Sequence, residues 1–510
     1  MGCMRRWTSC AVLLTLSALL GAPGCGDDDG GARDAGPMDG GPIDTGPVDA
    51  GSSDGGSTDG APGVDAAGLD GGPGRDGGVG AVRAVGLPWE DCEGGGRMLE
   101  AGPDDYRALL DMLEPGDTLR LRPGTYARGL PISRGGEEGR CVVIEGIEEG
   151  GERPLFLGSD AFNVIALRDV SWVKVRHLDL DGMGRAGFGV ASQNPDVPVH
   201  HVVIEDLEMV GFAANRQITG ISTKTPAWAW VIRGNRILEA GTGLYLGNSD
   251  GRQPFVGGLV EYNLVLNPRG YAMQIKHQRA EGRGDLALEG MPERATTIVR
   301  YNVFAKAERG EGGGGARPNL LVGHFPRRGA GVDDQYLIYG NLFWQNPTEN
   351  LFQGEGNVAF YANLLVNDGG GGVSVQPHND VPKRIDVFFN TILVRDRAIR
   401  VTGGDEGFAQ RVRWNALFGG TGIGGDAEVE GNVERADASA LRAPDAEPGA
   451  GLDLRPEDAA ALAVEADLES VAAYADADRA FDGTPRDGTT AGAYAASAGP
   501  GPVALEAPPY

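Results

Sequence analysis

The chain has 510 residues, of which 85 are Gly and 31 are Pro, so nearly a quarter of it is poorly suited to helix interiors and an ordinary helical enzyme is disfavoured. Hydrophobic residues make up 41% and the formal net charge is −27, which argues against a polytopic membrane protein and against a protein whose main role is binding nucleic acid. Residues 26–80 and 433–510 each carry a charge of −10, and Arg5 and Arg6 contribute +2, which leaves −9 on residues 81–432, so an anionic substrate is not excluded.

The first 24 residues predict a secretory signal. Arg5 and Arg6 precede an apolar run, Ala11 to Ala22, that is too short to span a bilayer. The run ends at Ala-Pro-Gly-Cys25, which resembles the lipobox of bacterial lipoproteins, in which the Cys receives lipid and becomes the first residue of the mature chain. Cleavage by an ordinary signal peptidase near Ala22 is the alternative.

Residues 25–85 predict a disordered tether. Asp recurs every five residues from Asp34 to Asp59 among Gly, Pro and Ser, so the segment cannot bury a core and its like charges keep it extended. We therefore expect an exported protein that is lipid-anchored to the bacterial outer membrane or cell surface, with the lipid as its only membrane contact.

The five cysteines agree with export. Cys3 and Cys10 leave with the signal and Cys25 carries the lipid, which leaves Cys92 and Cys141. Two cysteines in an exported domain most simply form one disulfide, here between the start of the domain and an early strand. Two unpaired buried thiols are the alternative.

The folded part, residues 86–432, opens with a predicted amphipathic helix over Asp104 to Leu113. The segment from Pro115 to Tyr126, with its PGD…L…PGTY pattern, follows the helix. It resembles the opening segment of right-handed parallel β-helix proteins of the pectate lyase-like superfamily, in which a helix caps the first coil.

Internal repeats extend this pattern along the chain. From residue 170 onward, short apolar segments each place Asn or a substitute for it after one strand-like run and before another, with spacings of 29, 29, 28, 39, 39, 22, 27, 25 and 17 residues. The marked positions are His177, Asp206, Asn235, Asn263, Asn302, Asn341, Asn363, Asn390, Asn415 and Asn432. Parallel strands cannot be joined by tight hairpins, and a coil of two or three strands needs about this many residues. The repeats predict an all-β right-handed parallel β-helix with an inward Asn ladder, closed by an acidic capping tail over 433–510.

Candidate site residues follow from the ends of the repeated strands. Two intervals between Asn positions are at least ten residues longer than the others, and insertions in a solenoid become loops on one face, here 278–295 and 305–318. The strands after the Asn turns end in a polar row beneath these loops, a plausible wall of a groove. The candidate catalytic residues are Lys276, His277, Arg317 and His324. The candidate substrate-binding residues are Tyr271, Gln274, Gln353, Glu355, His378 and Asp380.

Each of these residues also has a purely structural interpretation. Lys276 could be a solvated surface lysine, His324 a hydrogen-bonded turn residue, and His378 with Asp380 a polar turn after Pro377. Arg317 is either a carboxylate clamp or the end of a mobile loop. Asp333-Asp334 and the turn from Asn248 to Gly251 offer oxygen ligands for Ca²⁺ but too few to specify a metal site.

A narrower resemblance points to chemistry. The polysaccharide lyase family that contains chondroitinase B and alginate lyases carries a strand ending in Lys, an I-R-Y-N-x-F turn segment, and a strand with a catalytic Arg. Here AMQIK supplies Lys276 and IVRYNVF, Ile298 to Phe304, matches the turn, whereas LLVGHF has Val322 and Gly323 where the Arg stands.

This resemblance implies β-elimination on a uronate-containing glycan. Lys276 would act as general base, calcium or a cation would neutralise the carboxylate, and His277, His324 and Arg317 would supply nearby positive charge. The partner would be a polysaccharide, with no nucleic acid, and the chain a monomer. The alternative is a non-catalytic surface lipoprotein that binds glycan or serves as a structural or adhesive module, because the fold alone decides neither.

Overall fold

The computed structural model describes residues 89–284, 290–307 and 310–496. The predicted signal peptide, Cys25 and the tether lie outside the described residues, as do positions 285–289 and 308–309 of the two long loops. No helix among the described residues is long and apolar enough to cross a membrane.

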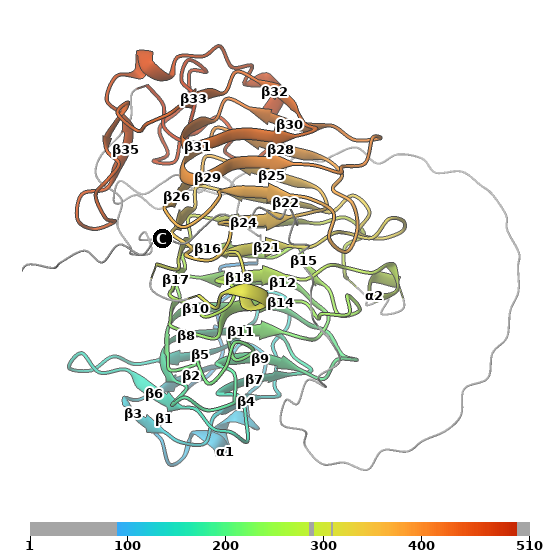
Figure 1. Ribbon diagram of the computed structural model, residues 1–510. Coiled ribbons are helices and arrows are strands. Elements are labelled where there is room, and N and C mark those ends of the chain that lie inside the picture. Colours follow the sequence, from blue (N-terminus) through green and yellow to red (C-terminus); the bar gives the residue numbers. More distant parts are fainter. Residues whose placement is uncertain (1–88, 285–289, 308–309, 497–510) are drawn as a thin grey trace, which may run out of the picture. The chain divides into compact units, whose positions relative to one another are not determined.

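The chain forms a right-handed parallel β-helix, as the repeats predict (Figure 1). Its strands hydrogen-bond in parallel from coil to coil and bend at corners into three faces, named here sheet 1, sheet 2 and sheet 3. The long strands β8, β10, β29 and β31 each pass through a corner and contribute to two sheets.

Sheet 1 consists of β1 (Met98–Ala101), β2 (Thr118–Leu121), β5 (Val142–Gly146), the first halves of β8 (Ser171–Asp181) and β10 (Val199–Val210), β12 (Ala227–Arg233), β15 (Phe255–Val256), β16 (Leu259–Glu261), β19 (Thr296–Arg300), β22 (Gln335–Tyr339), β25 (Val358–Tyr361), β28 (Ile385–Phe388), β30 (Gln410–Arg413) and β32 (Glu428–Glu430).

Sheet 2 consists of β3 (Gly124–Tyr126), β6 (Pro154–Leu157), the second halves of β8 and β10, β13 (Arg236–Leu238), β17 (Leu264–Leu266), β20 (Val303–Ala305), β23 (Leu342–Trp344), β26 (Leu364–Asn367), the first halves of β29 (Thr391–Val401) and β31 (Ala416–Gly425), and β33 (Val433–Arg435).

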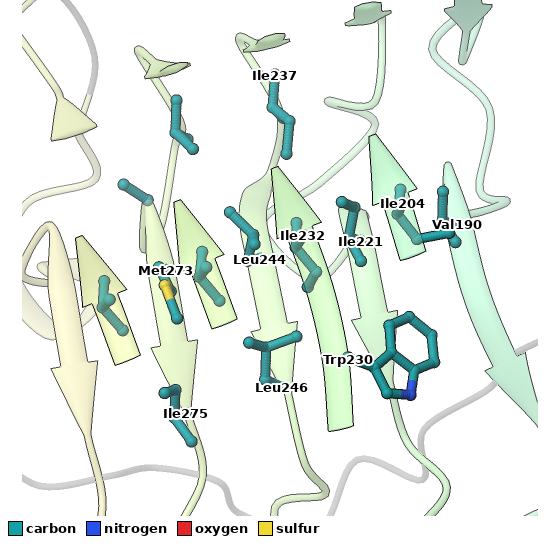
Figure 2. Close-up of a cluster of buried hydrophobic side chains, with 14 of the residues drawn as sticks. Val190, Ile204, Ile221, Trp230, Ile232, Ile237, Leu244, Leu246, Met273 and Ile275 are labelled. Carbon is teal, nitrogen blue, oxygen red and sulfur yellow. The ribbon is translucent and has the colours of Figure 1, made fainter. Parts of the chain in front are cut away.

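Sheet 3 consists of β4 (Leu130–Ile132), β7 (Ile165–Arg168), β9 (Val190–Gln193), β11 (Thr219–Thr223), β14 (Thr242–Leu246), β18 (Met273–Ile275), β21 (Leu320–Val322), β24 (Phe352–Gly354), β27 (Val373–Val375) and the ends of β29 and β31. Alternate side chains of all three sheets point inward and form one continuous core. Figure 2 shows part of it, where Ile221, Leu244 and Met273 of successive sheet 3 strands lie beside Ile204 and Ile232 of sheet 1.

The Asn ladder is confirmed at the corner between sheets 1 and 2. Each Asn side chain donates from Nδ2 to Oδ1 of the Asn in the next coil at 2.8–3.1 Å, and its backbone N–H donates to the same oxygen. The series runs through Asn235, Asn263, Asn302, Asn341, Asn363, Asn390, Asn415 and Asn432. The first seven of these residues are 0–1% exposed, so each amide supplies hydrogen bonds to polar groups of a buried corner.

The first two coils depart from the predicted alignment by one residue. His177 and Asp206 have φ of 61° and 51°, as does the residue before each later Asn, for example Tyr262 at 55°. The ladder position of these coils is therefore held by Leu178 and Leu207, and the Leu207 N–H donates to Asn235 Oδ1. His177 and Asp206 point outward, where the ring Nδ1 lies 2.6 Å from the Asp206 carboxylate.

A second ladder, of alternating charge, runs up the outer face of sheet 1. One residue per coil stands in register over seven coils: Arg120, Glu145, Arg176, Glu205, Arg233, Glu261 and Arg300. Neighbouring coils place opposite charges together, with 2.7 Å between Arg233 and Glu205 and 2.9 Å between Arg300 and Glu261. Above Arg300 the row becomes aromatic, with stacked rings of Tyr339, Tyr361 and Phe388.

Both ends of the described chain pack against the coils. At the start, α1 (Tyr106–Leu110) packs Tyr106 and Leu110 into the core, and a disulfide joins Cys92 to Cys141. Glu93 pairs with Lys174 of sheet 1 at 2.7 Å.

The tail contains an antiparallel pair, β34 (Leu441–Ala443) and β35 (Asp453–Pro456), and two 3₁₀ turns, η2 (Ala459–Leu462) and η3 (Glu469–Val471). It lies along the sides of the later coils: Val471 and Tyr474 pack on the outer face of sheet 1. Leu441, Leu454, Leu462 and Tyr494 pack on sheet 2.

The ladder makes a prediction about stability. Replacing Asn341 by Leu leaves the side-chain and backbone donors of Asn302 without their acceptor and removes one donor from Asn363 Oδ1, so the free energy of unfolding should fall by about 1–3 kcal/mol or more. Asn432→Leu is the matched control: it also removes an acceptor, here of Asn415, but at a partly exposed corner where water can replace it, so it should cost less. Denaturant unfolding of both variants measures the difference, and equal losses would contradict the ladder's role.

Candidate functional site

The outer face of sheet 3 differs from the other two. Its outward row, in register from coil to coil, reads Ser222, Tyr245, Gln274, Leu321, Gln353, Ser374 and Arg400. Ser222, Gln274 and Ser374 are buried, Tyr245, Leu321 and Gln353 are half-buried and Arg400 is exposed, so the face reaches solvent over part of this row. The terminal segments pack on sheets 1 and 2. The predicted Gln274 and Gln353 both belong to this row.

One border of the face brings together the predicted Lys276, His277 and His324. Lys276 follows β18 and is only 8% exposed, with its Nζ 5.7 Å from the centroid of the Tyr245 ring. The rings of His277 and His324 are stacked, with centroids 5.1 Å apart. Their contact follows from coil stacking, because Lys276 and Gly323 are equivalent positions after the paired strands β18 and β21.

His277 is held neutral at this border. Burial, together with the nearby positive charges of His324, Lys276 and Arg279, lowers the pKa of His277 from 6.5 to about 4. Its ring packs so closely on Gly251 that a β-carbon there would lie 2.7 Å from it. The imidazole is thus uncharged near pH 7.

The hydrogen bond of His324 fixes one of its ring hydrogens. Nδ1 lies 3.0 Å from the Phe325 carbonyl oxygen, which can only accept, so Nδ1 carries a hydrogen. A carboxylate oxygen of Asp380 lies 3.9 Å from the same Nδ1.

Glu355 and Asp380 make hydrogen bonds that hold the border together. Glu355 is 2% exposed and accepts the backbone N–H groups of His378, Asn379 and Asp380 at 3.1–3.3 Å. Asp380 accepts from Arg327 at 2.7 and 2.8 Å, and this guanidinium holds the pKa of Asp380 below its usual value. The prediction that both bind substrate overlooked these backbone and arginine partners. His378 is exposed at the turn that Glu355 holds.

Arg317 lies on the opposite border of sheet 3. Its guanidinium carbon is 5.8 Å from the ring centroid of Tyr271, which precedes β18, whereas Lys276 follows that strand. Arg317 Nη1 donates to the carbonyls of Gly314 and Ala316. The structure therefore separates Arg317 and Tyr271 from the group around Lys276, because the loop that carries Arg317 enters sheet 3 and the loop that carries His277 leaves it.

The sequence interpretation missed residues that become visible when the coils are aligned. Lys224 follows β11 at the same border, with its Nζ 5.5 Å from the Tyr245 ring centroid, so two ammonium groups share one ring. Arg283, in α2 (Ala280–Gly284), pairs with buried Asp334 and donates to Gln278, which holds the base of the long loop. Strand alignment could have found Lys224, whereas the loop pairing has no repeat to reveal it.

The described residues contain no group of three His, Cys, Asp or Glu side chains placed to hold a metal ion. Three of the oxygen ligands considered from the sequence have other partners: Asp334 pairs with Arg283, and Asn248 and Asp250 accept backbone N–H groups of their own turn.

No protein-family model and no curated protein matches the sequence. Among solved structures, the chain is similar to pectate lyase Pel9A, at 11% identity and a TM-score of 0.39 over 81% of this chain and 96% of that one. It is also similar to the alginate lyase AlyGC of the PL6 family, at 14% identity and a TM-score of 0.36 over 71% of this chain and 56% of that one.

A third similar structure is a mannuronic acid specific family 6 lyase from human gut microbiota, at 13% identity and a TM-score of 0.32 over 65% of this chain and 82% of that one. The chain thus spans little more than half the length of AlyGC. These likenesses concern the β-helix fold alone.

The buried histidine predicts a dependence of stability on pH. With a folded pKa of about 4 against 6.5 unfolded, His277 takes up its proton more readily when the chain unfolds, so stability should fall as pH drops from 6.5 to 4. His277→Gln should reduce this slope, measured by denaturant unfolding at several pH values. His378→Gln, which removes an exposed histidine of the same border, is the matched control. Equal slopes for wild type and His277→Gln would contradict the assignment.

Proposed function

We propose that the chain binds a uronate-containing polysaccharide on the outer face of sheet 3 and cleaves it by β-elimination. The observation that carries the proposal is the nearly buried Lys276, set at the border of a solvent-reaching polar face beside a neutral His277 and a second lysine, Lys224. An acidic chain that gathers cations along one face is suited to an anionic glycan.

Elimination needs a base and a counter-charge. Lys276 takes the proton from the sugar carbon next to the carboxylate, and the electron pair forms a carbon–carbon double bond as the bond to the glycosidic oxygen breaks. The leaving oxygen takes up a proton from the same ammonium group or from solvent, so no water is added and nothing is oxidised. A lysine shielded from water and close to other cations is suited to act as such a base.

Lys224, which shares the Tyr245 ring with Lys276, is the cation that we assign to neutralise the carboxylate. The strand where the resembling lyases carry an arginine has Val322 turned into the core and Gly323 at its end. A β-carbon on Gly323 would lie 2.4 Å from the His277 backbone nitrogen, so no side chain fits there. Lys224 comes from a coil on the other side of β18 from Gly323, and it is the cation that could take the place of this arginine.

The absence of a side chain at Gly323, where the resembling lyases carry an arginine, favours a second candidate function. A face without that arginine can bind acidic glycan without cleaving it, as a non-catalytic surface module would. The two functions share the ligand class and differ only in turnover.

Turnover is tested with purified protein on alginate, pectin and glycosaminoglycans, with and without Ca²⁺, by the near-ultraviolet absorbance of unsaturated uronate. Lys276→Ala should lower turnover by about 10²–10⁴-fold, the usual contribution of a general base, without changing the unfolding midpoint.

Lys276→Arg keeps the charge and should stay equally inactive, whereas Lys224→Ala is the matched lysine variant and should weaken binding more than turnover. Full activity of Lys276→Ala would contradict the catalytic assignment. Binding by a wild type that releases no unsaturated product would support the non-catalytic function.

We further propose that the chain is exported and carried on a lipidated Cys25. The resemblance of the segment before Cys25 to a lipobox supports this, together with the Asp-rich residues that follow. Mass spectrometry of the mature N-terminus and detergent partitioning should show a diacylglycerol-modified Cys25, and Cys25→Ser should move the protein to the aqueous phase. A mature, unmodified chain that begins elsewhere would refute the anchor.

A further inference from the structure

Three residues from three coils meet at the border of sheet 3 opposite Lys276. Arg216 precedes β11, Tyr271 precedes β18, and Arg317 precedes β21. Arg317 lies over the Tyr271 ring, and its Nη1 donates to Gly314. Arg216 Nη1 lies 3.4 Å from the carbonyl oxygen of the next residue, Gly315. Two guanidinium groups are thus held at one glycine turn beside an aromatic ring.

A buried framework fixes the backbone of Arg317. Its carbonyl oxygen accepts from Lys306 Nζ and from Asn346 Nδ2, both at 2.8 Å. Asn346 Nδ2 also donates to Asn319, and the Asn346 backbone N–H donates to Asn367 Oδ1. Lys306 and all three Asn side chains are fully buried. Arg317 therefore stands on a rigid base, as a ligand-binding residue requires.

Positive charge exceeds negative charge at this corner. Lys306, Arg216 and Arg317 face two carboxylates, those of Glu311 and Glu349, and Glu311 Oε2 lies 3.5 Å from Arg216. Arg269 lies at the same corner, where its carbonyl accepts the Glu311 N–H. A buried ammonium that is not fully compensated is costly, and an added anion would relieve it.

We propose that Arg216, Tyr271 and Arg317 form a second anion-binding point for acidic glycan, across sheet 3 from Lys276, and that buried Lys306 makes its affinity depend on pH. The proposal deepens the proposed function and rests on the ligand being an acidic glycan. The ring of Tyr271 offers a surface for a sugar, and the two arginines offer donors for a carboxylate or sulfate group.

The direction of the pH dependence follows from linkage. Burial lowers the pKa of Lys306 from 10.5 to about 7. The carboxylates of Glu349 and Glu311 oppose this shift, and the guanidinium groups of Arg317 and Arg216 add to it. A bound anion favours the ammonium form and raises this pKa, so binding takes up protons near pH 7. Affinity should therefore be higher at pH 6 than at pH 8.

The test measures binding by calorimetry in the Lys276→Ala background, so that no ligand is cleaved. The probes are oligomers of a polyuronate, a sulfated glycosaminoglycan and a neutral glucan, and the first two distinguish carboxylate from sulfate. Arg216→Gln should weaken binding of the preferred acidic probe by about 10- to 100-fold, the loss expected for a hydrogen bond to a charged group. Arg236→Gln, on sheet 2 with Glu208 as its partner, is the matched control and should bind normally.

The role of Lys306 has its own readout. Lys306→Met should bind with equal affinity at pH 6 and pH 8. Because this variant could fail to fold, proton uptake on binding is also measured, with Lys306 intact, in two buffers of different ionisation enthalpy.

Unchanged affinity of Arg216→Gln, or no proton uptake, would overturn the second binding point even if the wild type cleaves a uronate glycan. Failure of the chain to bind any acidic probe would instead overturn the proposed function itself.

Discussion

The spacing between coils is the constraint on which the rest of the structure depends. Parallel strands stack about 4.8 Å apart, so each position of a coil lies against the same position of its neighbours and every outward or corner residue becomes part of a row. If every coil placed the same charge at one position, neighbouring coils would repel each other. If every coil placed a group that can only donate or only accept there, its hydrogen bonds would stay unsatisfied. This chain meets the constraint in three ways: amides that donate and accept in turn from Asn235 to Asn432, charges that alternate from Arg120 to Arg300, and rings that stack from Tyr339 to Phe388.

The same constraint directs function to sheet 3. The outer face of sheet 1 is covered in part by the chain's own ends, through pairs such as Glu93 with Lys174 and Tyr339 with Asp476, and the tail packs on the later strands of sheet 2. On sheet 3 the polar row reaches solvent, and the long loops enter and leave at its two borders. Insertions at a corner leave the coil register undisturbed, so loops can place Arg317 and His277 on either side of the face without disturbing the core.

Much of this architecture could be predicted from the sequence, because a row that takes one residue from each coil appears in the sequence as a residue type that recurs at regular intervals. Asn263, Asn302 and Asn341 carry the ladder at a visible spacing, and strand ends aligned by that ladder correctly brought His277 beside His324. The alignment was wrong by one residue at His177 and Asp206. These two residues hold the left-handed corner position, which lies directly before the ladder position in each coil, so the sequence pattern confused the two positions. Partners outside the period were invisible: the backbone amides that occupy Glu355, and the loop that buries Lys306.

Rigidity is what links the two borders of sheet 3. Lys276 and Tyr271 flank one strand, β18, whose neighbours β14 and β21 hold it in register on both sides, so the separation between the two borders cannot adjust to the ligand. A glycan that contacts both must present its anionic groups at a matching interval, which is a condition on sugar spacing and not only on charge. Specificity in such a protein arises from the fixed spacing of the sheet 3 strands. The loops, which differ from coil to coil, determine which cationic side chains lie at the two borders.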